Sequence, residues 1–157
     1  MLDAAPEAAT FEFDEMFQDK IAGIFSRDTT FAKRVVDLVE PEYFTDQGTG
    51  EFVRLCKNHL QQFGNVPDGI SFVHLLKDIV ANNKIRQDLI QGVKDAFVKS
   101  RSADITNQDF VAKEVETFAK HQAIQNAMMA SIPMLEKRQF DKIGELMEKA
   151  TQVGLAD

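Results

Sequence analysis

The chain has 157 residues, of which 25 are acidic and 18 basic, so it carries a net charge of −7. This length predicts one folded domain, and the acidic balance argues against tight independent binding of nucleic acid, which needs a basic surface. The single cysteine excludes an internal disulfide and a Cys-rich zinc site, and no apolar run approaches the roughly 18 residues of a membrane span.

The N-terminal residues 1–12 form an acidic, Ala-rich leader that we expect to be disordered. Their sequence lacks the basic and apolar regions of a signal peptide. From Phe13 onward, apolar residues recur at intervals of three and four, which predicts a helix. The predicted stripe of this helix comprises Phe13, Phe17, Ile21 and Ile24.

A second helix is predicted over residues 29–39, where apolar residues again share one face. Asp28 or Thr29 is expected to cap its start by accepting hydrogen bonds from free backbone N–H groups. Pro41 is expected to end it, because proline disfavours the helical conformation in the preceding residue.

The middle of the chain shows three further apolar periods, each typical of a helix. They cover residues 50–63, 72–80 and 85–97. We expect Gly64 to end the first helix in a left-handed turn and Ser71 to cap the second. The pair Asn82-Asn83 is expected to separate the second from the third.

The last third of the chain predicts two long helices. Thr106 and Asp109 have the spacing of a capping box at the start of the first. Pro133 should kink or break this helix, because proline removes one backbone hydrogen bond. The second helix is predicted over 140–153, so the two form an αα-hairpin.

No segment alternates as a half-buried strand does, and the predicted fold class is therefore all-α. We expect a compact globular head of five to six helices over 13–103. A long αα-hairpin over 104–154 should follow and lead toward a linker, with head and hairpin making one domain overall.

The sequence predicts no catalytic, cofactor-binding or metal-binding residue. None of the eight glycines belongs to a phosphate-binding P-loop, and the histidines His59, His74 and His121 lack the spacing of metal ligands. Cys56 lies on the apolar face of a predicted helix, where we expect a small buried side chain.

One alternative concerns the run from His74 to Lys77, which resembles the H-x-L-K core of histidine phosphotransfer domains. A phosphate-accepting histidine must be exposed, with a cation nearby to stabilise the phosphate. Asp78 follows directly, and its carboxylate would repel a phosphate. The competing interpretation is that His74 is an ordinary residue on the polar face of a helix.

Four segments, in this order, resemble the N-terminal domain of DnaB-like replicative DNA helicases, and most closely those of phages of the T4 type. They are IAGIFSRDTTFAKRVVDLVEPEYF with its P-E-x-F turn, GEFVRLCKNHLQQFGNVPDGISFVHLLKD, VAKEVETFAKHQAIQNAM and DKIGELMEKATQVG. The resemblance extends over residues 14–154.

The resemblance implies an assembly domain without activity of its own. In such helicases these domains pair through their hairpins, form a collar on a hexameric ring, and offer a docking surface to primase or a helicase loader. ATP and Mg²⁺ belong to a separate motor domain that would follow this chain, so no cofactor is expected here. The expected location is the cytoplasm of a bacterium or phage-infected cell, and the alternative is a free-standing accessory protein of the helicase.

The apolar stripes of the hairpin predict an isologous contact, in which both copies use the same patch. The competing interpretation is that these residues pack the hairpin onto its own head. The expected contact residues are Phe118, Ile124, Met128, Ile132, Leu135, Phe140, Ile143 and Met147.

Overall fold

The structure is a computed structural model that describes residues 13–155, so the predicted leader lies outside the described residues. The described chain is all-helical, as predicted, and contains no strand. Its elements are α2 (Glu15–Arg27), α3 (Thr29–Val35), η1 (Pro41–Tyr43), α4 (Gln47–Phe63), α5 (Gly69–Ala81), η2 (Gln87–Leu89), α6 (Ile90–Arg101), α7 (Gln108–Glu136) and α8 (Phe140–Thr151).

Two aspartates define the start of the head. Asp14 caps α2 and accepts a hydrogen bond from the Phe17 N–H at 3.1 Å. Asp28 ends α2 and caps α3, accepting from the Phe31 N–H at 2.9 Å. The expected cap at Asp28 is therefore confirmed, and a single residue sets the turn between the two helices.

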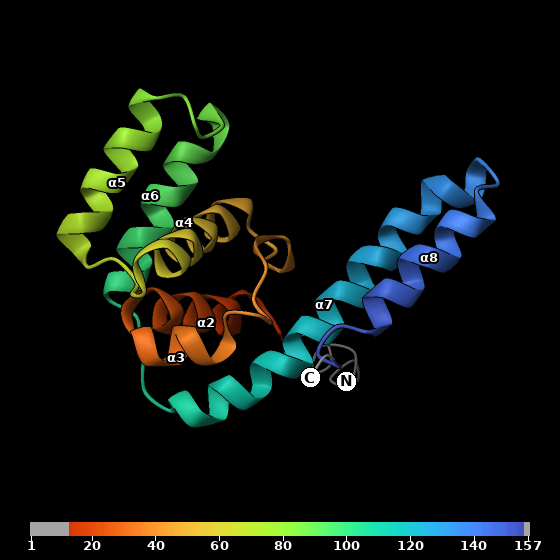
Figure 1. The fold of residues 1–157 in the computed structure, drawn as a ribbon, viewed down its shortest axis with the longest axis horizontal. Coiled ribbons are helices and arrows are strands. Elements are labelled where there is room, and N and C mark those ends of the chain that lie inside the picture. The colour runs from red at the N-terminus through yellow and green to blue at the C-terminus, as the bar shows by residue number, and fades with distance from the viewer. Residues whose placement is uncertain (1–12, 156–157) are drawn as a thin grey trace, which may run out of the picture.

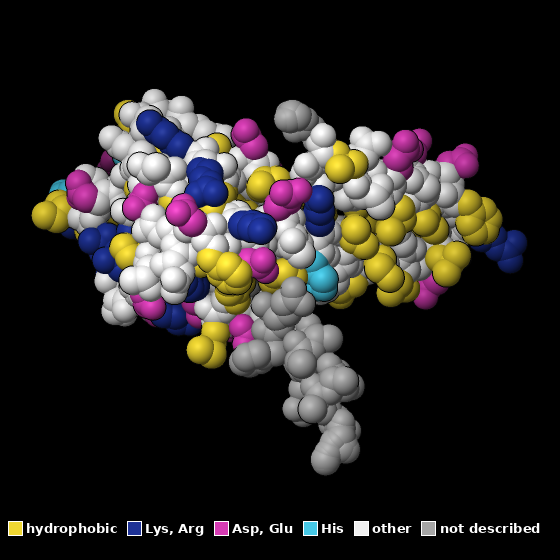
Figure 2. Space-filling model, turned by 90° about the horizontal axis from the view of Figure 1, so that it is seen from below, with side chains coloured by type: hydrophobic (Ala, Val, Ile, Leu, Met, Phe, Trp, Pro, Cys, Tyr) yellow, Lys and Arg dark blue, Asp and Glu magenta, His cyan; other side chains and the backbone are white. Residues whose placement is uncertain are grey.

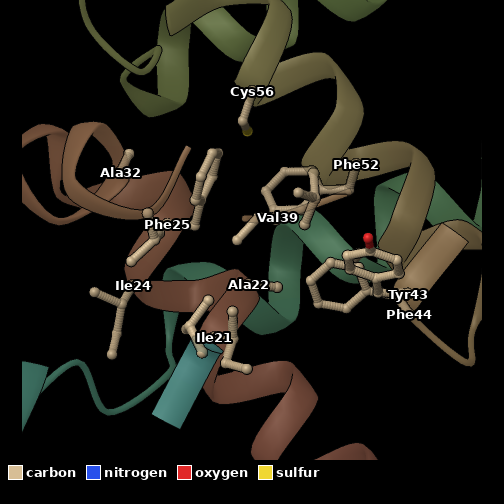
Figure 3. Packing of buried hydrophobic residues seen from close by; sticks show 14 of the residues in the cluster. Ile21, Ala22, Ile24, Phe25, Ala32, Val39, Tyr43, Phe44, Phe52 and Cys56 are labelled. Atoms are coloured by element: carbon tan, nitrogen blue, oxygen red, sulfur yellow. The ribbon is translucent and has the colours of Figure 1, made fainter. Parts of the chain in front are cut away.

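The core of the head lies where α2, α3, α4 and α6 meet, and Figure 3 shows its aromatic and aliphatic side chains interdigitating. Phe25, Phe52 and Val39 are among its fully buried members. The helices α4 and α6 approach so closely that a Cβ on Gly48 would lie 2.6 Å from the Gly92 backbone. Only glycine at these two positions permits the helices to cross so closely, and the crossing packs α6 against α4.

The ends of α4 and α5 follow local signals, with one correction. Gly64 adopts φ +84° and ends α4, and Asn83 with φ 54° follows the end of α5, both as predicted. The cap of α5 is Asp68 rather than Ser71, because the Asp68 carboxylate accepts from the Ser71 N–H at 2.8 Å. The helix consequently begins at Gly69.

The start of α7 also differs from the prediction, since there is no capping box. Asn107 has φ 61° and makes no capping hydrogen bond through its side chain. The Thr106 hydroxyl instead donates to Asp104 at 2.7 Å, as does the Thr106 N–H at 2.9 Å. The Asp104 carboxylate thus accepts both hydrogen bonds of Thr106 in a local turn, and Thr106 does not cap α7.

The helices α7 and α8 pack side by side and project from the head as a hairpin (Figure 1). The first half of α7 packs on α2, α3 and η1, so the head extends beyond the predicted boundary at 103. Pro133 does not break α7, which continues to Glu136. The proline lies in the last turn, where it removes a single backbone hydrogen bond and no long helical segment follows.

Candidate interaction surface of the hairpin

Phe118 joins α7 to the head. Its ring is fully buried, with ring centroids 5.8 Å from Phe13, 6.4 Å from Tyr43 and 5.6 Å from Phe44. We expected Phe118 in the contact stripe, but the structure places it in the core of the head. It shares the helical period of the stripe, and the aromatic residues that cover it come from distant parts of the sequence.

Two amide side chains fix α7 to the P-E-x-F turn at η1. Gln122 is buried, and its Nε2 donates to the Tyr43 carbonyl at 2.7 Å. One turn further, Asn126 Nδ2 donates to the Glu42 carbonyl at 2.9 Å. Consecutive carbonyls of η1 thereby bind consecutive turns of α7, which helps to set the direction in which the hairpin leaves the head. Composition and period gave no signal for these bonds.

The outer part of the hairpin consists of α7 and α8 packed side by side, away from the head (Figure 1). Ala127 on α7 and Ala150 on α8 are buried. Small side chains at these positions let the two helices approach each other closely. Three residues of the predicted stripe, Ile124, Ile143 and Met147, are half-buried in this hairpin.

The hairpin nevertheless leaves large apolar side chains in solvent, and Figure 2 shows hydrophobic side chains gathered along it. We call these residues the hairpin stripe, and each is 59–62% exposed. Its members are Met128, Met129, Ile132, Leu135 and Phe140. All but Met129 were predicted contact residues. Met129 was not predicted, because the predicted stripe runs from Met128 by four residues to Ile132 and then by three to Leu135. Met129 lies next to this series, three residues before Ile132.

The hairpin stripe is comparable in size with the largest apolar patch of a typical monomeric protein. Five large side chains with more than half of their surface exposed leave on the order of 500 Å² of apolar area. A monomeric protein seldom shows a larger contiguous patch, and patches of this size commonly mark interaction sites. The end of the hairpin adds exposed charges of both signs, among them Glu136, Lys137, Arg138 and Lys142.

The histidines and the cysteine, which are the candidates for catalysis or metal binding, are dispersed over the fold. His59 lies on α4, His74 on α5 and His121 on α7, and the described residues contain no group of three side chains suited to hold a metal ion. Burial raises the pKa of the Cys56 thiol well above its usual range, so the thiolate that a nucleophile requires is suppressed. Cys56 is the small buried residue that was predicted.

Within residues 13–155, no helix has the length and apolar character needed to cross a bilayer.

Comparison of the chain with protein-family models, with curated proteins and with solved structures finds no match. The resemblance to DnaB-like helicases therefore depends on the four sequence segments alone.

Proposed function

We propose that this chain is an assembly domain that associates with further copies of itself through the hairpin stripe. The observation that carries the proposal is the exposure of Met128, Ile132, Leu135 and Phe140 on a hairpin that projects from the packed head. Association would remove this apolar area from water, and each Å² buried contributes about 25 cal/mol to the free energy of association.

The geometry favours an isologous pair. Because the hairpin stripe lies on one projecting element, two hairpins can pack against each other while their heads stay apart. The packing of the first half of α7 on the head, together with the bonds from Gln122 and Asn126 to η1, orients each hairpin relative to its head. A pair of hairpins would therefore also set the relative orientation of two heads, as a regular ring requires.

On the sequence resemblance, we propose further that the chain is the N-terminal collar domain of a phage-type replicative helicase. The collar would support a hexameric ring and dock primase or a helicase loader in the cytoplasm of the infected or bacterial cell. ATP and Mg²⁺ would act in the motor domain, and this chain would carry no catalysis. The alternative within the same class is a separate accessory protein that joins such a ring.

A second candidate of another class is the histidine phosphotransfer domain, which the exposure of His74 on α5 favours. Lys77 lies one turn away and could face a phosphate on the histidine. Asp78 lies four residues from His74 on the same helix and would oppose that charge.

Sedimentation velocity over a range of protein concentrations tests the self-association. We expect a reversible shift from monomer to dimer or larger ring as concentration rises. A chain that stays monomeric throughout would contradict the proposal.

The reading frame beyond the codon of Asp157 separates the two helicase-related functions. Continuation into a P-loop ATPase supports the collar domain. A stop codon at that point supports the accessory protein.

A further inference from the structure

A second apolar surface lies between α5 and α6. These two helices stand at the opposite end of the fold from the hairpin (Figure 1). It is a groove of 530 Å³ with an almost entirely apolar lining, and we call it the α5–α6 groove. Its walls include Val73, Leu76, Val80, Ile90, Phe97 and Val98.

The floor of the α5–α6 groove is a packed aromatic cluster. Phe72 stacks on Phe97 with ring centroids 4.9 Å apart and an interplanar angle of 14°. Phe72 also meets Phe52 edge-on at 5.1 Å, which ties the floor to the core of the head. The groove is therefore preformed, and a ligand would not have to pay for ordering its base.

The walls of the groove are incompletely covered. Phe72 and Leu76 are the buried residues of α5, while Val73 on α5 is 42% exposed and Val98 on α6 is 66% exposed. The hydrophobic effect favours an apolar ligand at such a surface, because it would remove these side chains from water.

The charges at the groove have a single sign. Lys77 on α5 and Lys94 on α6 are the charged residues that line it, and neither forms an ion pair within the described part of the chain. The carboxylate of α6, that of Asp95, accepts a hydrogen bond from Gln91 at 3.0 Å, and neither Asp95 nor Asp78 of α5 lines the groove. Two unpaired ammonium groups beside an apolar groove, on a chain of net charge −7, select a ligand that is both apolar and acidic.

We propose that the α5–α6 groove binds an amphipathic helix of a partner protein, with an apolar stripe that fills the groove and acidic residues that pair with Lys77 and Lys94. A helix fits because the groove runs between two helices, and helix ridges pack into such grooves. A second copy of this chain does not meet the charge requirement. A symmetric contact would bring like lysines together, and the hairpin stripe of another copy is bordered by charges of both signs, among them Glu136, Lys137 and Arg138.

Two synthetic peptides test the proposal by fluorescence anisotropy. The first is a fluorescein-labelled helical peptide of about 18 residues, or about five turns. It carries leucines at positions i, i+3, i+4 and i+7 and glutamates on both sides of this leucine stripe. The second carries lysine at each glutamate position. We expect the acidic peptide to bind about tenfold more tightly, since each exposed ion pair gives about a two- to fivefold gain.

Variants of the groove locate the binding. Lys77→Glu combined with Lys94→Glu should reverse the preference between the two peptides. Val98→Asp should weaken binding of the acidic peptide by at least about tenfold, because it places a carboxylate in the apolar contact. The side chain of Val98 is largely exposed, so the variant should fold, which circular dichroism checks.

Ile132→Asp in the hairpin stripe should leave peptide binding unchanged, which separates this proposal from self-association. Equal binding of the two peptides, no binding at up to about 1 mM, or no effect of Val98→Asp would each overturn the proposal. So would binding of the chain to anionic lipid vesicles that Val98→Asp abolishes while neither peptide binds.

Discussion

Replacing Ile132 by aspartate should dissociate the assembled copies without unfolding the chain. Ile132 belongs to the hairpin stripe and is 59% exposed in the single copy. The exposed part of the side chain is the part that an isologous contact would bury. A carboxylate at this position would meet apolar side chains and, near the symmetry axis, a second carboxylate.

The size of the effect follows from the exposed fraction. Complete burial of an isoleucine side chain contributes about 1.5–3 kcal/mol, so the part exposed here contributes about 1–2 kcal/mol per copy. Two copies lose about 2–4 kcal/mol, which weakens the dissociation constant about 30-fold to 1000-fold before the cost of burying the carboxylate is added. The folded monomer loses much less, because most of the side chain already faces water.

Sedimentation equilibrium at about 1 to 200 µM measures the dissociation constant, and circular dichroism measures the fold. Ile70→Asp is the matched control, since Ile70 lies on α5 of the head and is 77% exposed. We expect Ile132→Asp to be monomeric where the wild type and the control associate. Unchanged association of Ile132→Asp, or equal weakening by Ile70→Asp, would refute the reasoning.

Four further outcomes are expected. Phe118→Ala should lower the free energy of unfolding by about 3–5 kcal/mol in urea titrations, since it removes a buried ring; a change in association alone would place Phe118 in the contact instead. Cys56 should react with Ellman's reagent only as fast as the chain unfolds, because its thiol is buried and its pKa is raised. Hydrogen bonds from the backbone N–H and hydroxyl of Ser71 hold the pKa of Asp68 below its usual range, so its stabilisation is present above about pH 4 and is lost as pH falls through the folded pKa; Asp68→Asn should flatten that acid-side loss in thermal unfolding curves. Incubation with acetyl phosphate should leave no acid-labile phosphate on the chain, whereas a label that His74→Ala removes would favour the phosphotransfer function.

Local sequence signals predicted most helices of the fold. The spacing of the apolar residues located these helices, and residues with a specific backbone role marked their ends, among them Asp28 and Gly64. These signals act over three or four residues and need no tertiary information. Where two residues compete for one local role, the local signal did not identify the right one. Asp68 caps α5 in place of Ser71, and Asp104 accepts the hydrogen bond of the Thr106 hydroxyl.

The sequence could not locate the point at which α7 leaves the head. Phe118 and Ile132 follow the same apolar period, yet one is fully buried and the other is mostly exposed. The difference arises from Phe13, Tyr43 and Phe44, which reach Phe118 from distant parts of the chain. A period identifies an apolar face but not the molecule that covers it.

The same limit explains why the polar attachments of the core were missed. Buried Gln18 donates to the Phe13 carbonyl and to Thr45 Oγ1, and its own oxygen accepts from the Thr45 N–H. Gln122 bonds to Tyr43 across 79 positions of sequence. A buried amide is tolerated only when such partners exist, and nothing local in the sequence marks them.

The attachment of α7 to η1 bears directly on how the hairpin could work as an assembly element. An apolar stripe on a freely hinged hairpin would still bind a second copy, but the heads would take many relative orientations. The continuous helix α7 limits that freedom, because its first half is packed on the head and its next two turns are bonded to the carbonyls of Tyr43 and Glu42. The P-E-x-F turn and the hairpin, which are separate motifs in the sequence, are thus joined in the fold, and the turn helps to set the angle at which the association surface is presented.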